Sequence, residues 1–196
     1  MTNSERRDRE LAYIADAETF GEMAECQKKL KKVNMLDRWE HQKIAEALKK
    51  VIPNSESLFV VLPFYCEYGT HIRLGNNFSA NYNCVMLDVA QITIGDNCMF
   101  GPNVSLYTAG HPIFPDTRNS GYEYGKAITI GDNCWLGGST TVVGGVSIGN
   151  NVVIGAGSVV TKDIPDNVVA AGNPCKVIRE ITEDDRRYLY KKELID

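Results

Sequence analysis

Three histidines are the side chains of this 196-residue sequence best suited to move a proton near neutral pH. A neutral imidazole can take a proton from a hydroxyl group, which is the task of a general base in acyl transfer. His41 lies in a charged, helical stretch, and His71 lies at the start of the first structural repeat. His111 differs from both, because Gly110 and Pro112 fix the backbone on either side of it. His111 is therefore the candidate catalytic base, with an ordinary loop histidine as the alternative.

The other reactive side chains do not indicate a different chemistry. The sequence contains no G-x-S-x-G motif, so it lacks the nucleophile elbow of a serine hydrolase. A metal site is not expected either. Carbonic anhydrases with the coiled repeat architecture described below bind zinc through three histidines, whereas the repeat region of this chain offers only two. Six cysteines form no C-x-x-C pair, no zinc spacing and no recognisable motif with a histidine: Cys26, Cys66, Cys84, Cys98, Cys134 and Cys175. Direct attack by an acceptor hydroxyl is the simplest mechanism left.

A six-residue repeat must position these residues, because it is the most regular feature of the chain. An aliphatic residue recurs at every sixth position from residue 130, and a small or branched residue follows four positions later. The same spacing occurs over residues 94–106 and, more weakly, over 74–86. A period of six suits neither a helix nor a single half-buried strand. The aliphatic positions of the main run are Ile130, Leu136, Val142, Ile148, Ile154 and Val160.

This period fits a coil with three flat faces, in which each face is one short strand followed by a turn. Stacked coils bury a continuous core, so we expect an all-β, parallel β-helix, with an antiparallel sandwich as the alternative. Cys84, Cys98 and Cys134 share one position of the repeat and are expected in the core. Gly, Asp and Asn between the aliphatic positions, as in 95–97 and 131–133, are expected to adopt the unusual dihedral angles of tight turns.

The repeat also divides the chain. Residues 1–57 are predicted to form a helical cap, and residues 58–180 the β-helix domain. Residues 107–127 leave the register of the repeat and are expected to form a protruding loop, which contains His111. Residues 181–196 are predicted to form a helical C-terminal tail.

Composition limits the partners. The net charge is −4 without a long basic run, so no nucleic-acid partner is expected. No apolar stretch has the length of a membrane span, so no membrane association is expected either. The charged first ten residues lack the apolar centre of a signal peptide, which favours a cytoplasmic location.

Several motifs in one order resemble the maltose and galactoside O-acetyltransferases of the hexapeptide-repeat superfamily. The similar stretches span nearly the whole chain: residues 77–83 (NFSANYN), 101–104 (GPNV), 110–112 (GHP), 154–165 (IGAGSVVTKDIP) and 171–179 (AGNPCKVIR). The resemblance implies a left-handed β-helix and a homotrimer with active sites between neighbouring β-helices. It also implies transfer of an acetyl group from acetyl-CoA to a hydroxyl of a small sugar.

The resemblance assigns roles to single residues. It places His111 at the catalytic base and Asn81 at the residue that stabilises the transition state, where a fixed donor is worth roughly 3 kcal/mol. Coenzyme A is expected along the coils, with ordinary surface charge as the alternative for the basic residues. The positions that match its binding residues are Trp135 and Gly138 for the pantetheine arm, Ala156, Thr161 and Lys162 further along, and Lys176 and Arg179 for the phosphates.

The acceptor site departs from the family. The family usually has an aspartate near the N-terminus, whereas this chain has Ile14 there and Asp16 two residues later. Asp16, Glu67, Asp88 and Glu123 are the candidate acceptor-binding residues, and a solvent-facing role is the alternative for the last three. Two other functions compete with sugar acetylation: an acetyltransferase of the same superfamily that acts on an antibiotic or an amino acid hydroxyl, and a non-enzymatic β-helix scaffold. The helical cap favours the sugar acceptor, and the retained histidine and cofactor motifs argue against a scaffold.

Overall fold

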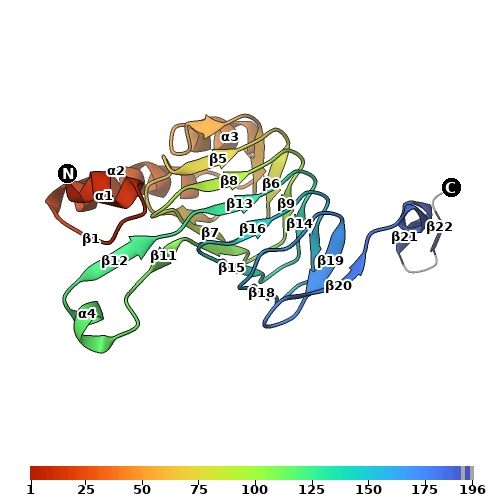
Figure 1. The fold of residues 1–196 in the computed structure, drawn as a ribbon. Coiled ribbons are helices and arrows are strands. Elements are labelled where there is room, and N and C mark those ends of the chain that lie inside the picture. Colours follow the sequence, from red (N-terminus) through yellow and green to blue (C-terminus); the bar gives the residue numbers. More distant parts are fainter. Residues whose placement is uncertain (191–192, 195–196) are drawn as a thin grey trace.

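Most of the chain winds into a parallel β-helix in the computed structural model, which describes residues 1–190 and 193–194 (Figure 1). Sheet 1 contains β2 (Asn54–Ser55), β5 (Ile72–Leu74), β8 (Ile92–Ile94), β13 (Ile128–Ile130) and β16 (Ser147–Ile148). Sheet 2 contains β3 (Leu58–Val60), β6 (Phe78–Ala80), β9 (Met99–Phe100), β14 (Trp135–Leu136), β17 (Val153–Ile154), β19 (Val168–Ala171) and the antiparallel β20 (Lys176–Glu180). Sheet 3 contains β4 (Phe64–Cys66), β7 (Cys84–Leu87), β10 (Ser105–Tyr107), β15 (Thr141–Val143) and β18 (Val159–Val160). The predicted β-helix is confirmed.

In-register pairing stacks each repeat residue on its equivalent one coil away. Ile94 pairs with Ile130, and Ile130 pairs with Ile148. All six aliphatic positions of the main run are buried, as are Cys84, Cys98 and Cys134. Full burial of each aliphatic side chain contributes about 1.5–3 kcal/mol, so the stacked column holds the coils together.

The turns between sheets 1 and 2 show which residues of the Gly-Asp-Asn pattern carry the unusual dihedral angles. Asn97, Asn133 and Asn151 have φ between 55° and 57°, whereas the glycines two positions earlier do not have positive φ. A Cβ at Gly131 would lie 2.6 Å from Asn150 Oδ1 and 2.9 Å from backbone of the next coil. The expectation is thus corrected for these glycines: they are needed because the coils approach closely, and the asparagines supply the left-handed turn.

These asparagines also form a ladder along the molecule. Each side-chain amide donates to the Oδ1 of the next asparagine, at 3.1 Å from Asn97 to Asn133 and 3.0 Å from Asn133 to Asn151. Beside the ladder, the backbone N–H of Asp96 donates to Asp132 Oδ1 at 2.8 Å. The turns are therefore bonded from coil to coil.

Helices close the first coil. They are α1 (Asn3–Asp8), α2 (Ala17–Asn34) and α3 (His41–Lys49), and the last two bury Leu30, Val33, Ile44 and Leu48 in the main core. The first coil begins at β2, which already pairs with β5 before residue 58. No helix among the described residues is long and apolar enough to cross a membrane.

The excursion between β10 and β13 is a hairpin that stands out from the coils (Figure 1). It consists of β11 (Ala109–Gly110), α4 (Pro115–Asn119) and β12 (Tyr122–Gly125), and β1 (Tyr13–Ile14) pairs with the outer side of β12.

The C-terminal tail differs from the predicted helix. Glu183–Arg187 form a single 3₁₀ helix, and β21 (Tyr188–Tyr190) and β22 (Glu193–Leu194) form an antiparallel pair. The helix ends at Arg187 because tyrosine, which follows at 188 and 190, favours the strand conformation. Residues 191–192 and 195–196 of the predicted tail lie outside the described residues.

Candidate active site

The hairpin positions His111 directly after β11. At its base, the buried Thr108 donates through Oγ1 to the carbonyl of Leu87 at 2.6 Å and accepts from the backbone N–H of Ala90 at 2.9 Å. Gly110 pairs with Tyr124, and a Cβ at Gly110 would lie 2.7 Å from the Tyr124 ring. His111 itself is exposed. The base of the hairpin is thus fixed, and the imidazole is free to meet a substrate.

Asn81 lies in the turn between β6 and β7, where it is exposed. Its Oδ1 accepts from the backbone N–H of Tyr82 at 2.8 Å, which leaves the amide nitrogen available as a donor. Asn81 precedes a strand of sheet 3, whereas His111 follows one, and β7 and β10 run parallel in register. Within one chain the two predicted catalytic residues therefore lie at opposite ends of sheet 3.

The structure brings Glu67 and Glu123 near one another. Glu67 follows β4, and Glu123 belongs to β12 of the hairpin. Burial, followed by the nearby carboxylates of Asp88 and Glu123, raises the pKa of Glu67 to about 7. Its Oε2 atom is buried without a hydrogen-bond partner among the described residues. Such an atom can accept a hydrogen bond from a ligand hydroxyl, or donate one when it carries the proton.

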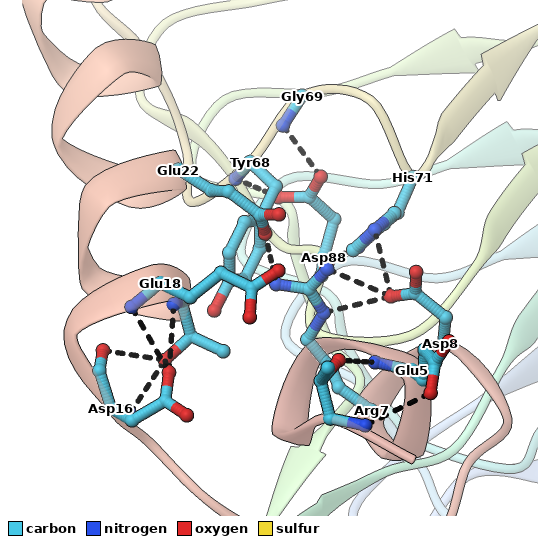
Figure 2. Close-up of polar contacts among 12 residues, drawn as sticks. Glu5, Arg7, Asp8, Asp16, Glu18, Glu22, Tyr68, Gly69, His71 and Asp88 are labelled. Atoms are coloured by element: carbon cyan, nitrogen blue, oxygen red, sulfur yellow. Dashed lines mark hydrogen bonds and ion pairs between the residues drawn. The ribbon is translucent and has the colours of Figure 1, made fainter.

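Asp88 has a structural task in this conformation. Its side chain is fully buried, and it accepts hydrogen bonds from the backbone N–H groups of Tyr68 at 3.0 Å and Gly69 at 2.6 Å (Figure 2). It also accepts one from the backbone N–H of Glu67 at 2.8 Å. It is therefore neither solvent-facing nor available to a sugar. Its charge fixes the turn that presents Glu67.

Asp16 is also occupied. It caps α2 by accepting the N–H groups of Glu18 and Thr19, each at 3.1 Å, and its Oδ2 accepts from Asn3 at 2.8 Å. The hydrogen bond from Asn3, followed by that from Thr19, lowers the pKa of Asp16. The sequence position suggested a sugar ligand, but the local geometry is that of a helix N-cap.

The predicted cofactor residues are spread over sheet 2, two corners of the coils and the edge strand β20. Trp135 projects from sheet 2 with about half of its surface exposed. Gly138 and Ala156 lie in successive turns at the corner of sheets 2 and 3, where the Gly138 carbonyl accepts from the N–H of Gly157 at 2.9 Å. Thr161 and Lys162 follow β18 at the far end of sheet 3, so one chain does not gather all of these residues.

Two further predicted cofactor residues, Lys176 and Arg179, are exposed on the edge strand β20. Arg179 is bound to Asp185 through both terminal nitrogens at 2.7 Å, and this hydrogen bond raises its pKa. A phosphate would have to share or displace Asp185 to use this guanidinium.

Two buried residues near the hairpin had no distinguishing signal in the sequence. Arg7 stands in a run of charged residues, yet it is 3 % exposed, and Tyr13 is 1 % exposed. Next to them lies a hollow of about 830 Å³ between α1, α2 and the first coil, lined by Arg7, Tyr68 and His71 among others. None of the predicted site residues lines this hollow.

Comparison with known proteins identifies relatives along nearly the whole chain. A profile of the family "Hexapeptide repeat of succinyl-transferase" matches residues 91–110 and 127–162. The galactoside O-acetyltransferase of Lactococcus lactis is 43% identical over 90% of this chain and 86% of that protein. That of Escherichia coli is 48% identical over 69% of this chain and 67% of that protein.

Solved structures agree. The maltose O-acetyltransferase from Clostridium difficile 630 superposes with a TM-score of 0.91 and 46% identity, covering 93% of this chain and 99% of that one. A galactoside acetyltransferase in complex with coenzyme A superposes with a TM-score of 0.92 and 37% identity, covering 100% of this chain and 99% of that one.

Proposed function

We propose that this chain, which belongs to the galactoside and maltose O-acetyltransferase family of hexapeptide-repeat proteins, transfers acetyl from acetyl-CoA to a hydroxyl of a small sugar. The observation that carries the proposal is the placement of His111, exposed directly after the paired strand β11 and held by a hairpin with a buried base. The relative solved with coenzyme A supports the same donor for this chain.

In the proposed mechanism, the imidazole of His111 removes the proton from the acceptor hydroxyl as its oxygen attacks the thioester carbonyl. A general base of this kind contributes about 10²–10⁴-fold to the rate. The amide of Asn81 donates to the oxyanion that develops, which is worth roughly 3 kcal/mol. The imidazolium then returns its proton to the departing thiolate of coenzyme A, and the acetyl ester is released.

A complete site would need two chains. His111 and Asn81 lie at opposite ends of sheet 3 in one chain. Four of the predicted cofactor residues are divided in the same way, with Gly138 and Ala156 at the Asn81 end and Thr161 and Lys162 at the His111 end. Neighbouring β-helices in a homotrimer would place the His111 end of one chain against the Asn81 end of the next. The outward side chains of sheet 2 include the exposed Phe59, Met99 and Trp135, which supports a face covered by another copy.

Glu67 and Glu123 are the proposed acceptor contacts. Both lie where the hairpin meets the coils, and the Oε2 of Glu67, which no described residue contacts by a hydrogen bond, is suited to a ligand hydroxyl. Asp88 holds the backbone of Glu67 by accepting its N–H. Asp16 is not included among the acceptor contacts because it caps α2.

Release of the coenzyme A thiol from acetyl-CoA tests the proposal across maltose, glucose, galactosides, serine and chloramphenicol. We expect turnover with a sugar, and a loss of at least about 10²-fold in His111→Ala. His41→Ala, which replaces an exposed histidine of α3, is the matched control and should retain full activity. Full turnover by His111→Ala would refute the role of His111 as general base. Exclusive use of serine or chloramphenicol would refute a sugar acceptor in favour of the alternative acceptor class.

A further inference from the structure

The N-terminal segment forms part of the sheet that carries His111. Strand β1 pairs antiparallel with β12, with Tyr13 opposite Glu123 and Ile14 opposite Tyr122. Strand β12 pairs in turn with β11, which ends at the residue before His111. Lys126, at the foot of the hairpin, lies 3.6 Å from the Glu10 carboxylate. Residues 10–14 thus bind the hairpin along the side opposite to β11.

Strand β1 has its own small core. Tyr13 packs with Tyr68 and Val89 in a buried cluster that is separate from the main core of the coils. Tyr68 belongs to the turn after β4, and Val89 to the turn after β7, so this cluster ties β1 to the first two coils. Burial, followed by the neighbouring Tyr68 and Glu123, raises the pKa of Tyr13, as expected for a phenol enclosed against a carboxylate. The hairpin therefore contacts the body through β1 as well as through its own base.

Arg7 fastens this arrangement from the helical side (Figure 2). Its guanidinium lies 4.3 Å from the centre of the Tyr68 ring and forms ion pairs with Asp8 at 2.8 Å and with Glu22 of α2. Burial opposes its charge, but hydrogen bonds with Glu22, Tyr68 and Asp8 raise its pKa above the ordinary value. The planar guanidinium of Arg7 thus contacts α1, α2 and the aromatic cluster at the same time. A lysine ammonium could not make all of these contacts.

We propose that residues 3–14 act as a strap that sets the position of the His111 hairpin, with Arg7 and Tyr13 as its two positioning residues. Neither residue would touch the substrates. His111 is exposed, so its place depends on the hairpin, and the strap supplies one of the hairpin's two attachments. The role in turnover rests on the proposed function of His111, whereas the mechanical role does not.

Hydrogen exchange and steady-state kinetics on the full-length protein test the strap together. In Tyr13→Ala we expect exchange in peptides covering 107–127 to rise roughly tenfold, while peptides covering 128–160 stay protected. We expect kcat to fall roughly 10- to 100-fold, because small misplacements of a catalytic group have effects of this size, with KM for acetyl-CoA nearly unchanged. Tyr13→Phe, which keeps the buried ring, should restore both.

Arg7→Lys is the second variant and guards against failure to fold, since it keeps the positive charge between Asp8 and Glu22. It should loosen the hairpin in the same peptides to a smaller extent. Lys28→Met, which removes a surface ion pair of α2, is the control and should change neither exchange nor kcat. Unchanged hairpin exchange in Tyr13→Ala, or a loosened hairpin with unchanged kcat in an enzyme that requires His111, would overturn the proposal. If His111→Ala turned over normally, the role of His111 as general base would be refuted. The hydrogen-exchange data would still decide whether residues 3–14 hold the hairpin in place.

Discussion

Replacing Glu67 with glutamine should make the protein more stable at high pH and remove part of its pH dependence. Burial, together with Asp88 and Glu123, raises the pKa of Glu67 from an ordinary value of 4.5 to about 7. The folded protein therefore holds a proton at Glu67 between these two pH values, whereas the unfolded chain has lost it. Since the folded state binds more protons, its stability falls as the pH rises from about 4.5 to 7.

The size of the effect follows from the two pKa values. One pKa unit corresponds to about 1.36 kcal/mol, so ionisation of Glu67 costs the folded state up to about 3 kcal/mol above pH 7. Glu67→Gln cannot ionise, and its amide can donate to the neighbouring Asp88 or Glu123 carboxylate. We expect the variant to be more stable than the wild type by about 1–3 kcal/mol at pH 8 and nearly equal to it at pH 4.5.

Urea unfolding at intervals from pH 4.5 to 8.5 measures the difference directly. Glu56→Gln, which replaces an exposed glutamate of the first coil, is the control and should follow the wild-type curve at each pH. If Glu67→Gln and the wild type lost stability in parallel between pH 5 and 8, the Glu67 carboxyl would not be enclosed as the structure shows. The inference about its role in the acceptor site would then lose its physical basis.

Three further predictions concern the scaffold and the donor site. Asp88→Asn should lower the free energy of unfolding in urea by about 1–3 kcal/mol. Backbone N–H groups donate to both carboxylate oxygens of Asp88, and in the variant one of them would face the NH₂ donor of the amide. Gly131→Ala should destabilise the protein by about 1–3 kcal/mol, because the added Cβ would lie 2.6 Å from Asn150 Oδ1. The control, Gly21→Ala in α2, adds a Cβ in open space and should stabilise the protein by about 0.5–1 kcal/mol. Equal effects of the two substitutions would contradict the close approach of the coils. Lys176→Met should weaken binding of coenzyme A measured by calorimetry, by an amount that shrinks as salt is added, and salt-independent binding would argue against a phosphate contact.

The β-helix could be predicted because its signal is local and repeated. Each hexad carries one inward aliphatic residue, and the pairing of Ile130 with Ile148, three hexads later, follows from the period alone. The pairing of Ile94 with Ile130 also depends on the hairpin between them leaving the coil, since these two residues are six hexads apart. The prediction for the turns was less complete. The sequence pattern shows a glycine and, two residues later, an asparagine in the turns at 95–97, 131–133 and 149–151. Only the structure shows that the glycine is needed for space between the coils and the asparagine for its positive φ.

The candidate site divides in the same way. The pattern Gly110-His111-Pro112 in a break of the repeat predicts from the sequence alone that His111 is the candidate base. Carboxylates have no comparable local signature, because an aspartate in a cap, in a buried turn or in a substrate pocket is the same letter in the sequence. The structure separates Asp16, which caps α2, and Asp88, which fixes a turn, from Glu67, whose Oε2 has no hydrogen-bond partner in the part of the chain that the structure describes.

By itself, then, the sequence determined the coil, the order of its strands and the place of the histidine along the chain, since each depends on neighbours within a few residues or on a fixed period. Only the tertiary structure decided which charges are buried and what they bind, because burial depends on segments far apart in the chain. Arg7 shows this most clearly: its neighbours in sequence are exposed or half-buried charges, and its burial follows from the meeting of α1, α2 and Tyr68. The pairing of β1 with β12, across more than a hundred residues, has the same origin.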